Sequence, residues 1–174
     1  MHEQTARLQR REQARQEHVK AWRFHPVGEA LQALRGGPCT VAVSMVSAIG
    51  DLTRVDHPRE LMKCLGLMPS EYSSGEPRRQ GSLTKAGNTH ARRALVEGAW
   101  AYRYPAKVSR HLQLRLEQQP KIIQDISWKA QVRLCTRYRR LVSRGKHANV
   151  VTVAIARELA GFMWAIAREV PVTP

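Results

Sequence analysis

The segment spanning residues 148–168 constrains the fold most strongly, because as a helix it is apolar on more than one face. Its large apolar side chains are Val150, Val151, Val153, Ile155, Leu159, Phe162, Met163, Trp164 and Ile166. A helix that is apolar nearly all round must be covered on several sides. We therefore predict that this helix forms either the centre of a helical bundle or an interface between subunits.

Helix-breaking residues divide the first half of the chain into short helices. Pro38, which follows two glycines, suits the first turn of a helix that continues through the apolar residues 41–49. Periodicity alone does not separate a buried helix from a buried strand here, but Gly50 suits a C-terminal cap, which favours a helix. A second helix is predicted over residues 58–65, with Asp56 as its capping side chain.

The two short helices predict a helical hairpin, and the alternative is that they are simply two core helices. Further on, Asn88 or Thr89 can cap a helix that ends before Pro105. A longer helix follows, with one apolar side made of Ile122, Ile126, Leu134, Tyr138, Leu141 and Val142. The chain is therefore predicted to be mainly α, a helical bundle.

The N-terminal residues differ from this bundle in composition. Residues 3–23 are rich in Arg, Gln and Glu and contain only Leu8, Val19 and Trp22 as sizeable apolar residues. Alternating charges without a wide apolar stripe are typical of a solvated helix. We predict an extended helical or coiled-coil arm over residues 1–28, a main domain over residues 29–170 and a short tail over residues 171–174.

Residues 66–88 do not fit a helical pattern. This stretch holds four of the eleven glycines, two of the nine prolines and five Ser and Thr side chains. A loop of this length inside a helical domain is uncommon, and such loops tend to be functional or disordered. The sequence therefore predicts a long Gly/Ser-rich loop that carries the active site.

The charge balance predicts a polyanionic partner. Lys and Arg number 29 against 14 Asp and Glu, which gives a net charge of +15. Such a potential attracts and holds phosphates, so nucleic acid is the expected partner and an anionic membrane surface is the competing one. No uninterrupted apolar run approaches the roughly 18 residues that a membrane span needs. We therefore expect a cytoplasmic protein that does not enter a membrane.

Two groups of cations are candidates for phosphate binding. The first surrounds the start of the helix after the loop, where free backbone N–H groups favour anions; it comprises Arg78, Arg79, Lys85, Arg92 and Arg93. The second lies within an arc of about 80° on the long helix and comprises Lys129, Arg133, Arg137, Arg140 and Arg144. Either group could instead be a solvated charged face.

Ser73 and Ser74 are the candidate nucleophiles, because two hydroxyls stand beside Gly75 among cations. A serine becomes nucleophilic when a base or a strong field favours its ionisation, and nearby cations stabilise a phosphoryl transition state. The alternative is an ordinary turn. The histidines and cysteines do not recur at metal-ligand spacing, so no metal site is expected in this chain.

Several spaced motifs carry a family resemblance. They are Ile49-Gly50-Asp51, residues 65–75 (LGLMPSEYSSG), residues 79–88 (RQGSLTKAGN) and residues 92–100 (RRALVEGAW). In this order, over about residues 30–168, they resemble the C-terminal transposase domain of the insertion-sequence 110/116/902 family. The resemblance implies a DNA recombinase in which a serine attacks a phosphodiester and forms a transient serine–DNA link, and it points to Ser74, with Ser73 as the close alternative.

The same resemblance implies further components. They are an N-terminal acidic domain that binds a divalent metal such as Mg²⁺, a coiled coil for assembly into a homo-oligomer or with a partner transposase subunit, and a structured guide RNA. The chain departs from the family pattern at Arg35-Gly36-Gly37-Pro38, where a Pro-Gly-x-Gly turn is usual, and no carboxylate cluster precedes the matched region. We therefore expect a truncated form that is inactive without the acidic domain.

Two functions remain open from the sequence. One is DNA transposition by site-specific recombination, with this chain supplying the DNA-binding and catalytic-serine domain. The other is a non-catalytic basic helical module that binds DNA or RNA. The Ser73-Ser74-Gly75 block distinguishes them, because a module that only binds nucleic acid does not need a nucleophile.

Overall fold

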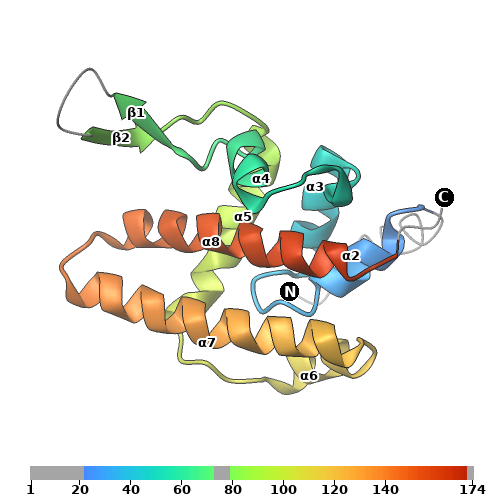
Figure 1. Ribbon diagram of the computed structural model, residues 1–174. Helices are drawn as coiled ribbons and strands as arrows, with labels where there is room; N and C mark the ends of the chain where they lie inside the picture. The colour runs from blue at the N-terminus through green and yellow to red at the C-terminus, as the bar shows by residue number, and fades with distance from the viewer. Residues whose placement is uncertain (1–21, 73–78, 172–174) are drawn as a thin grey trace, which may run out of the picture.

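A computed structural model describes residues 22–72 and 79–171. The elements in chain order are α2 His25–Leu31, α3 Cys39–Ile49, η1 Leu52–Arg54, α4 Pro58–Cys64, β1 Pro69–Tyr72, β2 Arg79–Leu83, α5 Thr89–Ala99, η2 Trp100–Arg103, α6 Arg110–Glu117, α7 Lys121–Ser143 and α8 Ala148–Arg168. The predicted mainly α class is confirmed. Figure 1 shows α7 and α8 side by side, with the β1–β2 ribbon projecting above the end of α8 where that helix begins.

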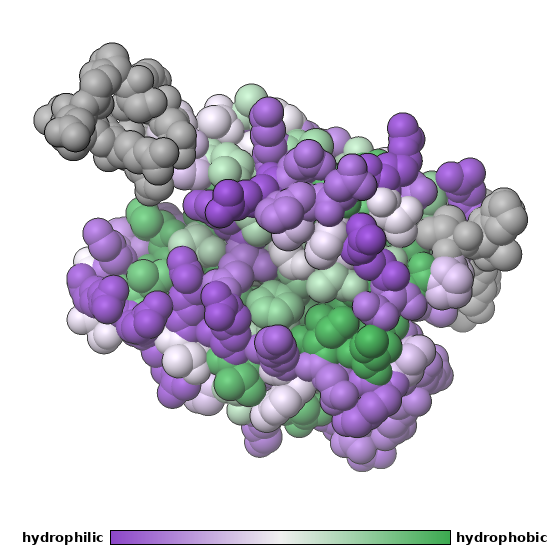
Figure 2. Space-filling model, in the orientation of Figure 1, coloured by the Kyte–Doolittle hydropathy of each residue, from purple (hydrophilic) through white to green (hydrophobic). Residues whose placement is uncertain are grey.

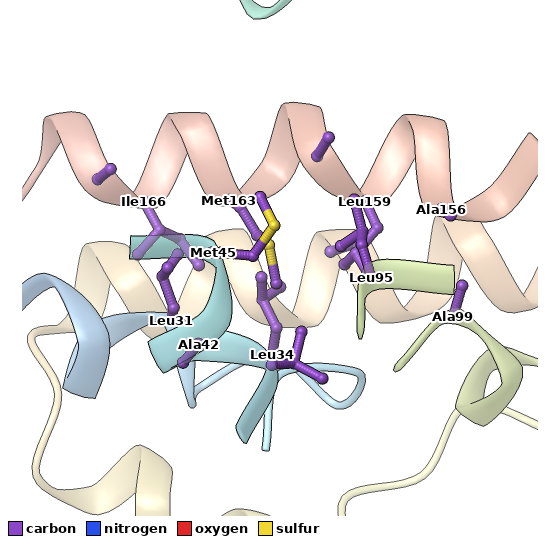
Figure 3. Packing of buried hydrophobic residues seen from close by; sticks show 14 of the residues in the cluster. Leu31, Leu34, Ala42, Met45, Leu95, Ala99, Ala156, Leu159, Met163 and Ile166 are labelled. Atoms are coloured by element: carbon purple, nitrogen blue, oxygen red, sulfur yellow. The ribbon is translucent and has the colours of Figure 1, made fainter. Parts of the chain in front are cut away.

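Helix α8 is the centre of the bundle, as one of the two alternatives predicted. It packs against α7, α5, α4 and α2, and Ile155, Leu159 and Met163 have no exposed surface. In Figure 3, Met163 and Leu159 meet Met45 of α3 and Leu95 of α5. By length and composition α8 is also long and apolar enough to cross a membrane, contrary to our expectation. Half of its most apolar 18-residue stretch is, however, buried inside the protein.

Local signals placed several helix ends correctly. Asn88 is the N-cap of α5, because its Oδ1 accepts a hydrogen bond from the backbone N–H of Ala91 at 2.9 Å. Gly50 follows α3 with φ of +70°, a conformation that glycine adopts without strain. The predicted Asp56 cap is wrong, since the ring Nδ1 of His57 caps α4 at the N–H of Arg59.

The predicted helical hairpin is wrong. Helix α3 packs on α5 and α2, whereas α4 packs on α8, so the two are core helices with separate partners. Between them Asp51 caps the short helix η1 through the N–H of Thr53. The chain therefore turns away from α3 before α4 begins.

The apolar side predicted for α7 is only partly correct. Ile122 and Val142 are 49% and 44% exposed. The buried side instead consists of Ile123, Ser127, Ala130, Gln131, Leu134, Cys135 and Tyr138. Small and polar residues belong to it because Ser127 donates a hydrogen bond to the carbonyl of Ala33 at 2.6 Å, inside the core. Helix α6, capped by Ser109, was not predicted.

The stretch at residues 66–88 is not a structureless loop. Strands β1 and β2 pair antiparallel, from Pro69 opposite Leu83 to Tyr72 opposite Arg79, with an irregularity between Pro69 and Glu71. Ser73, Ser74 and Arg78 lie outside the described residues. Most of the predicted arm also lies outside them, and the predicted boundary after residue 28 falls inside α2, whose Val27 and Leu31 belong to the core.

Candidate nucleic-acid interface

Close backbone contacts hold the two ends of the β1–β2 ribbon together. The N–H of Lys85 donates to the carbonyl of Gly66 at 3.2 Å, and the N–H of Asn88 donates to the carbonyl of Cys64 at 3.1 Å. A Cβ at Gly87 would lie 2.1 Å from the Cys64 carbonyl oxygen, and Gly87 has φ of +125°. Because no other residue fits this space and this conformation, the glycine fixes the base of the ribbon.

Arg92 also stabilises the base of the ribbon. Its Nη1 donates to the carbonyl oxygens of Leu65 at 3.0 Å and Lys85 at 3.1 Å, and its Nη2 donates to the hydroxyl of Thr89 at 3.3 Å. The half-buried guanidinium therefore joins the end of α4, the end of the ribbon and the start of α5. Three of its five N–H bonds are directed at protein acceptors.

A groove opens beside this base, between the ribbon, α4 and the ends of α7 and α8 that are joined at residues 144–147. We call it the basic groove, and its charged lining residues are Arg59, Lys85, Arg133, Arg137, Lys146, Arg157 and Glu158. Its volume is about 1060 Å³. Six cations against one carboxylate make it strongly positive, and clefts lined by one sign of charge concentrate counter-ions.

Glu158 partly neutralises two of these cations. Its Oε1 accepts a hydrogen bond from Nε of Arg133, and its Oε2 lies 3.2 Å from Nε of Arg137. The glutamate side chain is only 18% exposed, whereas the two arginines remain 60% and 38% exposed. Glu158 therefore offsets part of the charge of both guanidinium groups while leaving part of each accessible to a ligand.

Apolar side chains also line the groove. Val150 and Val153 of α8, Met62 of α4, and Pro69 and Leu83 of the ribbon line it. Val150 is 61% exposed although it belongs to the most apolar helix. Figure 2 shows hydrophilic and hydrophobic residues side by side at this end of the molecule, below the ribbon.

The structure brings some of the predicted phosphate-binding residues together and separates others. Lys85, Arg133 and Arg137 line the basic groove although they come from two different predicted groups. Lys129 and Arg140 of α7 and Arg144 at its C-cap are exposed outside the groove. Arg93 lies in a second, smaller groove between α3 and α5, beside His90. Of Arg79 the structure describes the backbone in β2 but not the side chain.

Sequence reasoning missed Arg59, Lys146 and Arg157, which also line the groove. A signal existed for Arg157, because Arg157 and Glu158 are a charged pair in the middle of the most apolar helix. Charged residues are rarely placed on a buried helix without a partner or a ligand. Arg59 and Lys146 carry no such signal, since both lie in charged surface segments.

The carboxylate, histidine and cysteine side chains of the described residues form no group of three or more that could hold a metal ion. The divalent metal implied by the family resemblance therefore does not fit this part of the chain. What the groove offers is positive charge and hydrogen-bond donors, which suit a phosphate backbone.

Comparisons with known proteins agree with the resemblance in the sequence. The family model described as Transposase IS116/IS110/IS902 family matches residues 28–113. A Sinorhizobium fredii protein named as the transposase y4qE is 50% identical over 153 residues, which is 88% of this chain and 39% of that protein. A Pseudomonas aeruginosa protein named as a family 20 transposase is 29% identical over 92% of this chain and 40% of its own length.

A shorter match covers 42% of this chain and 20% of a Coxiella burnetii transposase for insertion sequence element IS1111A, at 30% identity. The chain thus spans about two fifths of the length of the first two relatives.

Proposed function

Because the chain belongs to the IS116/IS110/IS902 family of transposases, we propose that it acts in DNA transposition and holds the DNA backbone in the basic groove. The proposal rests on one observation: six cations and a single carboxylate line the same groove at the base of the ribbon. Phosphate contacts of this kind position a duplex and do not read its sequence. The proposal places the protein in the cytoplasm, where it meets its DNA.

The length of the ribbon sets the distance between the groove and the far end of the two strands. Pro69 and Leu83 line the groove, and Tyr72 and Arg79 are paired at the far end of the strands. With a rise of about 3.3 Å per residue, that far end is about 10 Å from the groove. DNA held in the groove is therefore close to the far end of the strands, and Tyr72 at that end directly precedes Ser73 and Ser74 in the sequence.

In the proposed reaction the Oγ of Ser74 attacks a DNA phosphorus atom. An Oγ–P bond forms as the serine hydroxyl gives up its proton, one P–O bond of the phosphodiester breaks, and the departing oxygen takes up a proton to leave a free hydroxyl end. Ser73 is the alternative nucleophile. Cations around the phosphate stabilise the charge that develops in the transition state. No step of this proposal depends on a metal held by the described residues.

Charge removal in the groove tests the binding step. We expect Arg59→Gln, Lys85→Gln and Arg157→Gln together to weaken binding of a fluorescent duplex, measured by anisotropy at several salt concentrations. The slope of log K against log salt should fall by roughly 2 to 3, at about 0.9 per lost phosphate contact. A matched control, Arg110→Gln, Lys121→Gln and Arg168→Gln, removes the same charge elsewhere. Equal slopes in the two triple variants would refute the groove as the binding site.

Serine substitution tests the chemical step separately. Ser74→Ala should abolish covalent capture of target DNA by an active transposase complex while leaving the salt-dependent binding unchanged. Ser73→Ala should retain capture, and loss in Ser73→Ala alone would transfer the role to Ser73. Undiminished capture in both variants would leave the chain as a basic nucleic-acid-binding module without serine chemistry.

A further inference from the structure

An aromatic and arginine cluster lies at the opposite end of α5 from the ribbon. We call it the stacking patch, and it consists of Trp100, Arg103 and Tyr104. The guanidinium carbon of Arg103 lies 4.7 Å from the ring centre of Tyr104 and 6.0 Å from that of Trp100. Arg103 also donates a hydrogen bond to the hydroxyl of Tyr104. The arginine therefore holds two aromatic side chains in one cluster.

The backbone beneath this cluster is firmly held. Nη1 of Arg35 donates to the carbonyl of Pro105 at 2.7 Å, and its guanidinium carbon lies 5.9 Å from the Tyr104 ring centre. Tyr102, between the patch residues in sequence, is fully buried, and its hydroxyl accepts a hydrogen bond from the N–H of Gly36 at 3.4 Å. Burial raises the pKa of the Tyr102 hydroxyl, so it stays protonated. The patch is thus ordered before any ligand arrives.

The aromatic rings are nevertheless accessible. Tyr104 is 51% exposed, although large aromatic side chains usually contribute to the core. A hollow of about 450 Å³ lies against the patch and is lined by Glu97, Trp100, Ala101, Arg103 and Tyr104. This volume matches the lower range of small-ligand sites, which begins at about 300 Å³. The packing of the fold does not require an exposed tyrosine here.

We propose that the stacking patch binds unpaired bases of a single-stranded nucleic acid. Single strands are held by aromatic side chains on which bases stack, together with cations that follow the backbone. The patch supplies both, because the guanidinium groups of Arg35 and Arg103 lie against its rings and Glu97 is the carboxylate that lines the hollow. An arginine plane can itself stack on a base. A DNA strand and an RNA strand share this chemistry.

This site is distinct from the basic groove and does not rest on the proposed transposition. Helix α5 begins at the base of the ribbon and is 11 residues long, so η2 lies about 16 Å further along its axis. The groove is lined by charged side chains beside the base of the ribbon, whereas the stacking patch is built from aromatic rings. The two sites should therefore differ in whether binding depends on bases or only on phosphates.

The experiment compares oligonucleotides with and without bases. A 12-mer of thymidines and an abasic 12-mer have the same phosphates, so their difference in affinity measures base stacking. We expect the full chain to bind the thymidine strand at least about fivefold more tightly, since stacking contributes about 1–3 kcal/mol per base. Tyr104→Ala should remove most of this preference, and Tyr104→Phe should keep it.

Controls separate the patch from other exposed aromatic residues. Trp128→Ala removes a tryptophan that is 49% exposed on α7 and should leave the preference unchanged. A uridine 12-mer, run in parallel, identifies whether RNA or DNA is preferred. Equal affinity of the wild-type chain for the thymidine and abasic strands would overturn the proposal. An unchanged preference in Tyr104→Ala, in protein that retains duplex binding and helical content, would also overturn it.

Discussion

The basic groove and the stacking patch are both positively charged surfaces, but they are built in opposite ways. The groove collects cations from α4, α7, α8, the turn between α7 and α8 and the segment after β2, and only one carboxylate opposes them. The patch is local, since its three residues come from five consecutive positions and two of them are aromatic. The net charge of +15 is therefore not spread over one uniform surface. A phosphate backbone suits the first surface, and exposed bases suit the second.

Gly87→Ala should have the largest effect, and it should lower both the stability of the fold and duplex binding in the groove. The added Cβ meets the Cys64 carbonyl oxygen at 2.1 Å, at a φ of +125°. We expect a loss of about 2–4 kcal/mol in the free energy of unfolding, measured by urea denaturation, and weaker duplex binding by the remaining folded protein.

The control for this prediction is Gly28→Ala. A Cβ at Gly28 meets nothing within 4 Å, and alanine favours the helix, so stability should rise by about 0.5–1 kcal/mol. Base-dependent binding should persist in both variants. If Gly87→Ala is as stable as the wild type, the close contact at the base of the ribbon does not exist.

Arg92→Ala tests whether this residue holds the ribbon or contacts DNA. Its guanidinium has three protein acceptors, and loss of such hydrogen bonds should lower stability by about 1–3 kcal/mol. Arg92→Lys should restore part of the loss. Because the group is engaged within the protein, we expect an unchanged salt dependence of duplex binding; a slope lower by about 0.9 would assign Arg92 to a phosphate instead.

Glu158→Gln should produce the smallest change. It should strengthen duplex binding, whereas Gly87→Ala should weaken it. Removal of the carboxylate frees Arg133 and Arg137 from their partner, so duplex affinity should increase by about threefold to fivefold, with an effect of about 1 kcal/mol. Glu117→Gln, at an exposed carboxylate of α6, is the matched control. Anisotropy titrations measure both, and a fall in affinity for Glu158→Gln would show that the pair is needed to orient the arginines.

Local chemistry explains which parts of the fold the sequence predicted. Helix α8 was placed with its correct ends, and Gly50 and Asn88 were correctly assigned to helix ends, because caps and all-round apolarity act within one element. The buried side of α7 was misjudged, since which face is covered depends on where α8 lies. The β1–β2 ribbon was missed because its strands, Pro69–Tyr72 and Arg79–Leu83, are short and mostly polar and lack the alternating apolar pattern that predicts a strand.

The candidate site was predicted only in part for a related reason. The sequence predicted Lys85 from its place near a helix start, and Arg133 and Arg137 from their shared face of the long helix. The fold brings all three to one groove. Arg59 joins them from a charged surface segment that carries no local signal, whereas Arg157 could have been recognised as part of a charged pair within the apolar helix α8. The exposed position of Tyr104 likewise follows from the turn after η2, which Arg35 holds from a distant part of the chain.

Protection of lysines from acetylation tests whether duplex DNA lies in the basic groove of the wild-type chain, since it needs no substitution. Lys85 and Lys146 line the basic groove, and Lys121 lies at the other end of α7. The wild-type chain is acetylated with and without duplex DNA at moderate salt, and the modification of each lysine is measured by mass spectrometry. We predict that the duplex protects Lys85 and Lys146 several-fold more than Lys121. Equal protection of all three lysines, or stronger protection of Lys121, would contradict the account.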